Sequence, residues 1–298
     1  MKQNTNSNNT NTQNRSACCK AAAMEPRDHS KNRANPKNLM SMGNFIMFVL
    51  LYMNLSIIVA NAQNNTHYDF VGSYYDGIAR VKLNGKYGYI NRSGERITPL
   101  KYDIVNDFNE GMGLVECFNQ GGKNGIYFGF VDKTGREVIP LKYFWASDFH
   151  EGLAAVEQQP SISSLKGYID KTGKVVIPFQ FNRAGNFSEG LAAVQTMEGR
   201  IGEEKYGYID KTGKLVIPYK YEKAEDFSEE LACVKFNNKR GYINKMGQVI
   251  ISFKYYIAGN FDGGVAYAMK EMNGATIYID KKGNEYSTKE AAIRAVKK

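Results

Sequence analysis

One repeated phrase limits the fold of this 298-residue chain more than any other feature. It consists of glycine, an aromatic residue, Ile or Val, Asp or Asn, a cation, any residue, and a second glycine. Clear copies span residues 88–94, 129–135, 167–173, 207–213 and 241–247, and a degenerate copy spans residues 277–283. A period of this length indicates a modular array in which each unit buries its apolar face against the next.

Other positions recur at fixed distances from the first glycine. Four copies carry proline, and the fifth carries serine: Pro99, Pro140, Pro178, Pro218 and Ser252. An aromatic residue follows at Tyr102, Tyr143, Phe181, Tyr221 and Tyr255. A phenylalanine comes next, at Phe108, Phe149, Phe187, Phe227 and Phe261. We expect both sets of rings to form the contacts between units.

Each unit is predicted to be a meander of three strands. The closing runs, such as Leu191–Val194, precede a Gly-Tyr-Ile strand and then a Val-Ile-Pro strand, all rich in β-branched or aromatic residues. Between the last two strands, Asp170–Gly173 has the composition of a type I turn whose glycine takes a positive φ. We expect the proline to end the third strand, because it cannot donate to the ladder.

The fold class is therefore all-β, a tandem array of about six three-stranded antiparallel meanders over residues 70–286. Two geometries remain open, an open β-array or solenoid and a ring closed like a propeller, and the long gap between proline and Phe favours the open array. Residues 287–298 are predicted to form a short helix, because Ser287–Glu290 has capping-box spacing. The helix is expected to cover the last unit.

On these residues the chain resembles the WG-repeat family, whose unit contains Trp-Gly-Tyr-Ile-Asp-Lys-Thr-Gly-Lys-Val-Val-Ile-Pro and later Phe-x-Glu-Gly-Leu-Ala-x-Val. The resemblance covers about residues 70–286. The family's tryptophan is replaced in this chain by Tyr87, Phe128, Lys166, Tyr206 and Arg240. The resemblance implies an array of β-repeats and supplies no catalytic residues to carry over.

The N-terminal part differs in composition. Residues 1–41 are rich in Asn, Thr, Ser, Lys and Arg and are expected to be disordered. Residues 42–62 contain an apolar run that ends in Ala60-Asn61-Ala62, which is typical of a cleaved secretory signal. An uncleaved signal anchor is the alternative. Residues 63–69 form the expected linker, and Met40 or Met42 is an alternative start.

Charge and cysteine content narrow the function classes. The basic surplus beyond residue 62 falls to about +4, which does not indicate nucleic-acid binding. Cys117 and Cys233 are expected to be small, part-buried strand residues and not a disulfide. The turn cations are expected either to form a basic ladder or only to keep the turns soluble: Arg92, Lys133, Lys171, Lys211, Lys245 and Lys281.

The sequence predicts no catalytic, cofactor-binding or metal-ligating residue and leaves the binding residues undefined. His67 and His150 are expected to be solvated loop residues, and the recurring turn aspartates serve the turn. Four recurring glutamates are expected to form structural salt bridges or caps: Glu110, Glu151, Glu189 and Glu229.

We therefore expect a non-enzymatic scaffold or binding module, periplasmic, at the cell surface or secreted, that holds a protein partner. Membrane anchorage is expected if the signal is not cleaved. The alternative is a cell-wall or glycan-binding module, in which loop aromatics such as Tyr127 or Phe128 stack on sugars. A hydrolase of unrecognised type is the third hypothesis.

Overall fold

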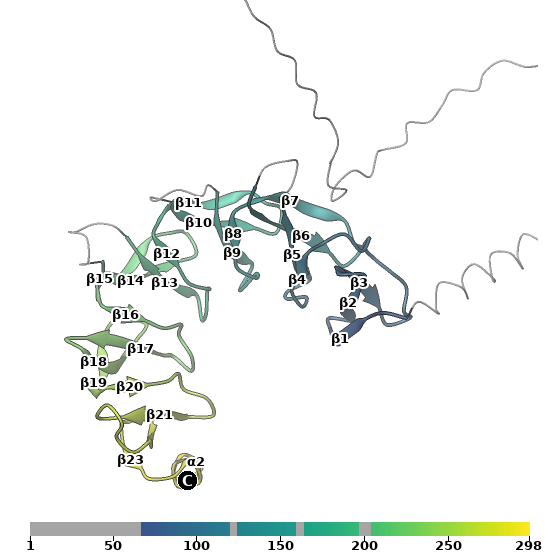
Figure 1. Cartoon of the computed structure of the whole chain (residues 1–298). Helices are drawn as coiled ribbons and strands as arrows, with labels where there is room; N and C mark the ends of the chain where they lie inside the picture. Colours follow the sequence, from purple (N-terminus) through teal and green to yellow (C-terminus); the bar gives the residue numbers. More distant parts are fainter. Residues whose placement is uncertain (1–66, 120–123, 159–163, 197–203) are drawn as a thin grey trace, which may run out of the picture.

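The computed structural model describes residues 67–119, 124–158, 164–196 and 204–298 (Figure 1). The predicted extension, the signal or anchor segment and residues 63–66 lie outside the described residues. Within those ranges, no helix has both the length and the apolar character needed to cross a membrane.

The described part of the chain consists of short strands and one C-terminal helix. In chain order they are β1 (Phe70–Tyr75), β2 (Ile78–Leu83), β3 (Lys86–Asn91), β4 (Ile104–Val105), β5 (Met112–Phe118), β6 (Ile126–Asp132), β7 (Glu137–Tyr143), β8 (Trp145–Ala146), β9 (Leu153–Glu157), β10 (Lys166–Asp170), β11 (Val175–Phe181), β12 (Arg183–Ala184), β13 (Leu191–Gln195), β14 (Tyr206–Asp210), β15 (Leu215–Tyr221), β16 (Lys223–Ala224), β17 (Leu231–Phe236), β18 (Lys239–Asn244), β19 (Val249–Tyr255), β20 (Ile257–Ala258), β21 (Val265–Met269), β22 (Ile277–Asp280), β23 (Glu285–Tyr286) and α2 (Lys289–Val296).

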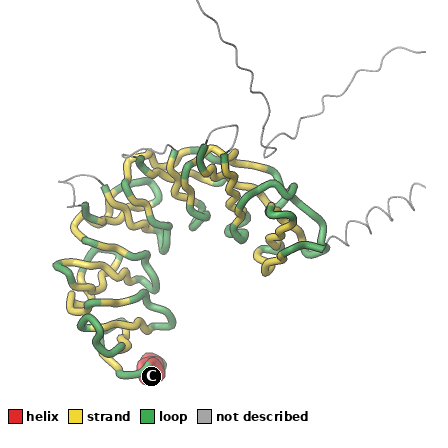
Figure 2. The backbone as a smooth tube through the Cα atoms, viewed as in Figure 1, coloured by secondary structure: helices red, strands yellow, loops and turns green. Residues whose placement is uncertain are grey.

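These strands form six antiparallel sheets in tandem, numbered here sheet 1 to sheet 6 along the chain. Sheet 1 contains β1–β3, and each later sheet contains four consecutive strands, beginning at β4, β8, β12, β16 and β20. The sheets follow one another along an open arc, with β1 near one end and α2 at the other (Figures 1 and 2). The all-β class, the six units and the open array are thus confirmed.

The number of strands per unit is corrected. In sheets 2 to 6 the segment between the recurring aromatic and Phe contains a two-residue strand, such as β8, which pairs with the closing strand β9. This strand was missed because two residues carry no detectable period. The unit therefore begins one strand earlier than predicted, and sheet 6 starts at Ile257.

Each junction between neighbouring sheets has its own apolar core. At the junction of sheets 3 and 4, Tyr168 of β10 meets Phe187 of the next sheet edge-on, with ring centroids 4.9 Å apart. The Tyr168 hydroxyl donates to the carbonyl of Gly185 at 2.8 Å. Equivalent ring pairs are Tyr89–Phe108, Phe130–Phe149, Tyr208–Phe227 and Tyr242–Phe261. Burying one such ring contributes about 2–3 kcal/mol, and the expected role of the recurring Phe is confirmed.

The predicted hairpin turn is also confirmed. In the turn between β10 and β11, one carboxylate oxygen of Asp170 accepts the backbone N–H groups of Thr172 and Lys174 at 2.9 and 3.1 Å. The N–H of Gly173 donates to the Asp170 carbonyl, and Gly173 has a φ of +82°. The short aspartate side chain thus stabilises the type I turn through these hydrogen bonds, and the glycine supplies the positive φ.

The predicted place of the proline is wrong. Pro140, Pro178 and Pro218 lie inside β7, β11 and β15, where the pairing register shifts. At such a bulge the proline removes no ladder hydrogen bond. The bulged backbone also explains the first glycine of the phrase, because a Cβ on Gly167 would lie 2.6 Å from the carbonyl oxygen of Ile177.

The C-terminal helix α2 covers sheet 6, as expected. Its N-cap is Thr288, whose side chain accepts the N–H of Ala291, so the cap is one residue later than the predicted Ser287. Ala292 is fully buried, and Val296 lies over Gly264 of the last sheet. The helix therefore takes the place that a seventh sheet would occupy.

Candidate functional site

A repeated polar link joins neighbouring sheets at one end of their strands, which we call the tight-turn end. A two-residue hairpin lies there, such as Glu151–Gly152, with both residues at positive φ and with His150 and Leu153 exchanging backbone hydrogen bonds. This geometry is a type I′ turn, in which a non-glycine first residue is strained. The glutamate at this strained position is one of the four recurring glutamates.

That glutamate contacts the following sheet twice. Glu151 accepts the N–H of Gly190 at 3.0 Å and forms an ion pair with Lys211 at 2.9 Å. The same arrangement links Asp76 to Gly111 and Lys133, Glu110 to Gly152 and Lys171, Glu189 to Glu230 and Lys245, and Glu229 to Gly264 and Lys281. We call this set the carboxylate ladder, and it spans all five junctions.

The ladder stabilises the charged form of its four glutamates. Burial alone would raise the pKa of Glu151, but Lys211 and the N–H of Gly190 together outweigh burial and lower the pKa. The pKa of Glu189 is lowered in the same way by the N–H of Glu230 and by Lys245. The expectation of a structural salt bridge for these glutamates is confirmed.

The turn cations are therefore neither a free basic ladder nor merely solubilising residues. Five of the six, all except Arg92, form ion pairs with the ladder carboxylates of the preceding sheet. Arg92 belongs to sheet 1, the first sheet among the described residues, and its guanidinium lies 5.6 Å from the ring centre of Tyr74. The sequence could not show this pairing, because each pair joins residues of different units.

In each four-stranded sheet, variable side chains lie along the edge opposite the fourth strand. We call this side the first-strand edge, since it is formed by the two-residue strands β4, β8, β12, β16 and β20. The second residue of each is a valine or alanine that packs toward a core, so alternation turns the first residue outward. Trp145 is the exception, since it is half-buried and also packs against the core between sheets 3 and 4. These first residues differ from one sheet to the next: Ile104, Trp145, Arg183, Lys223 and Ile257.

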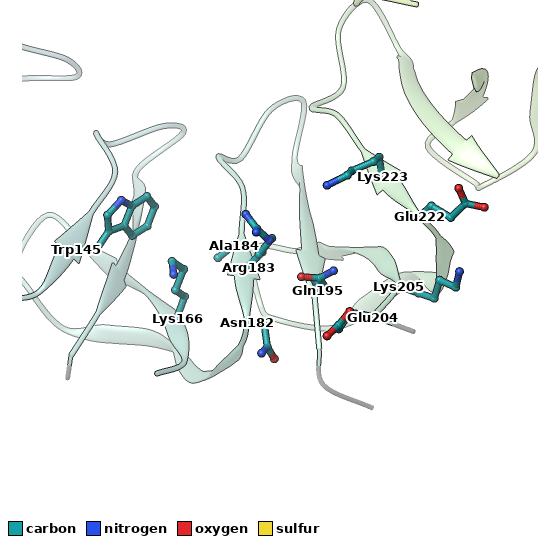
Figure 3. A pocket seen from close by; sticks show the side chains of 10 residues that line it. All are labelled: Trp145, Lys166, Asn182, Arg183, Ala184, Gln195, Glu204, Lys205, Glu222 and Lys223. Atoms are coloured by element: carbon teal, nitrogen blue, oxygen red, sulfur yellow. The ribbon is translucent and has the colours of Figure 1, made fainter. Parts of the chain in front are cut away.

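A recess of about 780 Å³ lies along this edge between β8, β12 and β16, and we call it the central recess (Figure 3). Trp145, Arg183 and Lys223 line it from three successive sheets. Lys166 lines it as well, at one of the positions where the family has tryptophan. A repeated frame thus presents a different side chain from each sheet to one open recess.

Trp145 and Lys166 are packed together at the β8 side of the central recess. The Lys166 ammonium lies 5.0 Å from the centre of the Trp145 ring and 2.8 Å from Glu157. Burial alone would raise the pKa of Glu157, but Lys166 and Ser164 lower it. The only tryptophan of the chain therefore stands beside the lysine that replaces the family's tryptophan.

Two further recesses adjoin the central one. A recess of about 650 Å³ shares Lys223 with it and is lined by Tyr256 and Tyr267. A smaller one of about 260 Å³ shares Arg183 and contains Asp226. Burial raises the pKa of Asp226, and His150 offsets part of that increase. The three recesses extend over sheets 3 to 6.

The aromatic residues named for sugar stacking lie elsewhere than expected. Tyr127 and Phe128 belong to β6 and not to a loop. Tyr127 is buried in the core between sheets 1 and 2, and Phe128 packs against the next core. The expectation that both rings lie in a loop is therefore wrong, and Tyr127 is buried whereas Phe128 is half-buried.

The histidines and cysteines considered from the sequence lie in turns, at the start of the described chain or in the apolar cores. His150 is half-buried in a tight turn, and His67 is exposed. Cys117 and Cys233 are buried in the first and last junctions and donate to carbonyls of Lys101 and Ala258. Across the described ranges, no group of three or more His, Cys, Asp or Glu residues is placed to hold a metal ion.

Comparison with known proteins identifies the class. The profile of the family described as "WG containing repeat" matches residues 66–87, 87–119, 128–159, 167–199, 206–239 and 241–271. These matches cover more than half of the chain, so the chain belongs to the WG-repeat family. No curated protein matches it.

Solved structures resemble the chain in fold alone. A structure titled as the eukaryotic initiation factor has a TM-score of 0.50 and 11% identity, with 74% of this chain and 65% of that chain covered. Oligopeptidase B from Trypanosoma brucei has a TM-score of 0.45 and 8% identity, with 76% of this chain and 41% of that chain covered. The β-propeller domain of the Trilobed protease from Pyrococcus furiosus has a TM-score of 0.42 and 14% identity, with 73% of this chain and 82% of that chain covered. The chain spans less than two thirds of the length of the first two.

Proposed function

We propose that this chain is an exported, non-enzymatic binding module that holds a protein partner along its first-strand edge at the cell envelope. The WG repeats and the β-repeat fold support a repeat-built binding module. One observation carries the finer proposal: equivalent positions on a repeated frame present Trp145, Arg183 and Lys223 to one recess. Extended repeat arrays use such surfaces for partners, because each unit adds contact area and varies separately.

The recurring acidic residues support binding over catalysis. Asp132, Asp170 and Asp210 each accept backbone N–H groups of their own turn. The recurring glutamates form the carboxylate ladder. Their oxygens are thus already used in holding the array together, and the proposed task falls to the variable residues of the first-strand edge.

The test is photo-crosslinking in the native host. A photoreactive amino acid is placed at Arg183 or Lys223, and at Val216 on the fourth strand β15 as the control. We expect protein adducts from the first two positions and few from the third. Equal adducts from all three, or none from Arg183 and Lys223, would count against the proposal. Fractionation of the same cells checks export.

Glycan binding is the second candidate function, and one observation favours it. Tyr267 is 49% exposed and Tyr256 is 40% exposed, and both line the recess beside Lys223. Exposed rings at a recess are suited to stacking on sugars. Sedimentation with peptidoglycan tests this candidate, with Tyr267→Ala as the site variant and Tyr75→Ala, at the exposed end of β1, as its control. Only the first substitution is expected to reduce binding.

A further inference from the structure

The charged groups of the central recess are not balanced. It is lined by four cations and two carboxylates: Lys166, Arg183, Lys205, Lys223, Glu204 and Glu222. Lys166 is paired with Glu157. Both carboxylates are already engaged, since Glu222 forms an ion pair with Lys235 at 3.4 Å and Glu204 has an interaction partner of its own.

Arg183 and Lys223 remain for a ligand, whereas the charge of Lys205 already acts on Glu222. Arg183, Lys205 and Lys223 form no ion pair with any residue in the described part of the chain. Arg183 and Lys223 are exposed to solvent and occupy the same place in successive sheets, as first residues of β12 and β16. Figure 3 shows Lys223 extending from β16 toward the strand that carries Arg183.

We propose that the central recess binds an acidic, extended segment of a protein partner through Arg183 and Lys223. This inference rests on the proposed function and specifies its ligand chemistry. Unpaired cations in a shared recess attract carboxylates from solution and favour partners of opposite charge. Guanidinium also donates a planar pair of N–H groups that matches a carboxylate.

The spacing favours an extended ligand. Arg183 and Lys223 belong to neighbouring sheets. A peptide that crosses from β12 to β16 contacts both cations, which favours it over a single compact anion. Glu204 and Glu222 lie beside Lys205 and Asp226 lies in the adjoining small recess, so the acidic part of the segment is expected between Arg183 and Lys223. A nucleic acid is less suited, because the surplus charge beyond residue 62 is only about +4.

The test uses the full chain and a fluorescein-labelled peptide of alternating Glu and Ser residues, followed by fluorescence polarisation. Peptides of alternating Gln and Ser, and a single-stranded oligonucleotide, are the comparison probes. The site variant is Arg183→Glu with Lys223→Glu. The control variant is Lys142→Glu with Lys220→Glu, which changes the net charge equally at fourth strands β7 and β15.

We expect the acidic peptide to bind, with affinity falling about tenfold or more in the site variant and about twofold or less in the control. Arg183→Gln with Lys223→Gln is expected to weaken binding by an intermediate factor, and the thermal unfolding of every variant checks that it folds. Equal losses in both charge-reversal variants, no binding of the acidic peptide by the unaltered chain, or tighter binding of the oligonucleotide would overturn the inference. Adducts at Arg183 with a partner that lacks acidic segments would overturn it as well, while leaving the proposed function intact.

Discussion

Polar links between neighbouring sheets are distributed differently at the tight-turn end and along the fourth-strand edge, the edge formed by β7, β11, β15, β19 and β23. At the tight-turn end, a carboxylate links every pair of sheets, from Asp76 to Glu229. At the fourth-strand edge, Glu137 and Glu285 make such links only in the first and last junctions. Glu137 pairs with Lys101 and accepts the Tyr102 hydroxyl, and Glu285 does the same with Lys254 and Tyr255.

The three middle junctions have apolar residues in that place. Val175, Leu215 and Val249 replace the glutamate, and each is at least 40% exposed. Tyr221 stands one repeat before Tyr255, as Val249 stands one repeat before Glu285, and its buried hydroxyl has no hydrogen-bond partner in the described part of the chain. The difference teaches that a link to backbone N–H groups is kept in every copy, because any residue supplies the N–H. A link between two side chains is lost when either one changes.

The largest expected effect concerns the turn glycines of the tight-turn end. A Cβ on Gly135 would overlap the carbonyl oxygen of Ile97, whereas one on Gly173 would meet only the Ile139 side chain at 3.2 Å. Both glycines have a φ near +82°. We expect Gly135→Ala to lower the free energy of unfolding by about 4 kcal/mol, and Gly173→Ala by about 1–2 kcal/mol. Urea unfolding measures both changes. Equal losses of unfolding free energy would show that the backbone around Ile97 moves to accommodate the added methyl group.

Removal of one ladder carboxylate is expected to have the next largest effect. Glu151→Ala leaves the N–H of Gly190 and the ammonium of Lys211 without their acceptor. We expect a loss of about 2 kcal/mol, since hydrogen bonds to charged groups contribute about 1.5–3 kcal/mol. Lys211→Met removes only the half-exposed ion pair and is expected to cost about 0.5 kcal/mol. A larger loss for Lys211→Met than for Glu151→Ala would contradict the importance of the backbone link.

The ladder also predicts how stability depends on pH. Its four glutamates have pKa values below those of unfolded glutamate, so they stabilise the fold above the unfolded pKa, and that contribution is lost as pH falls through the folded pKa. Asp148 and Asp226 act in the opposite direction, because burial raises their pKa and favours the protonated fold. We expect unfolding free energy to fall below about pH 5. The fall should be shallower in Glu151→Gln with Glu189→Gln, and an unchanged slope would argue against the ladder.

A smaller gain is expected from restoring the lost link at the fourth-strand edge. In Val249→Glu, the new carboxylate would lie opposite the Tyr221 hydroxyl and near Lys220, as Glu285 does with Tyr255 and Lys254. We expect a gain of about 1 kcal/mol in unfolding free energy. Leu215→Glu is the matched control, because Phe181 opposite it has no hydroxyl, and no gain is expected there. Equal changes in the two variants would mean that the orphaned hydroxyl does not matter.

The smallest expected effect concerns an exception at the tight-turn end. Glu230 has a φ of +71° at a place that is glycine in the other turns, such as Gly190 and Gly264. Its N–H, and not its side chain, contacts Glu189. Glu230→Gly is therefore expected to raise the midpoint of thermal unfolding slightly, by about 0.5 kcal/mol in free energy. Glu229→Gly, which removes a ladder carboxylate, should lower that midpoint.

Local patterns were sufficient for much of the fold. The Asp170–Gly173 turn, the strands on either side of it and the C-terminal helix follow from neighbouring residues. The turn and its strands recur along the chain, whereas the helix occurs once. The buried role of the recurring Phe followed from its fixed spacing. The two-residue strands and the bulge at Pro178 were not predictable, because neither has a period long enough to detect.

The sequence by itself determined that this chain is a β-repeat array with a capping helix, since turn chemistry and apolar spacing act over a few residues. The tertiary structure alone decided which groups meet between units. Glu110 reaches Gly152 and Lys171, and Arg183 shares a recess with Lys223, across distances in sequence that no local preference spans. Those contacts depend on how the sheets are offset and twisted against one another, and this stacking set both the ladder and the first-strand edge.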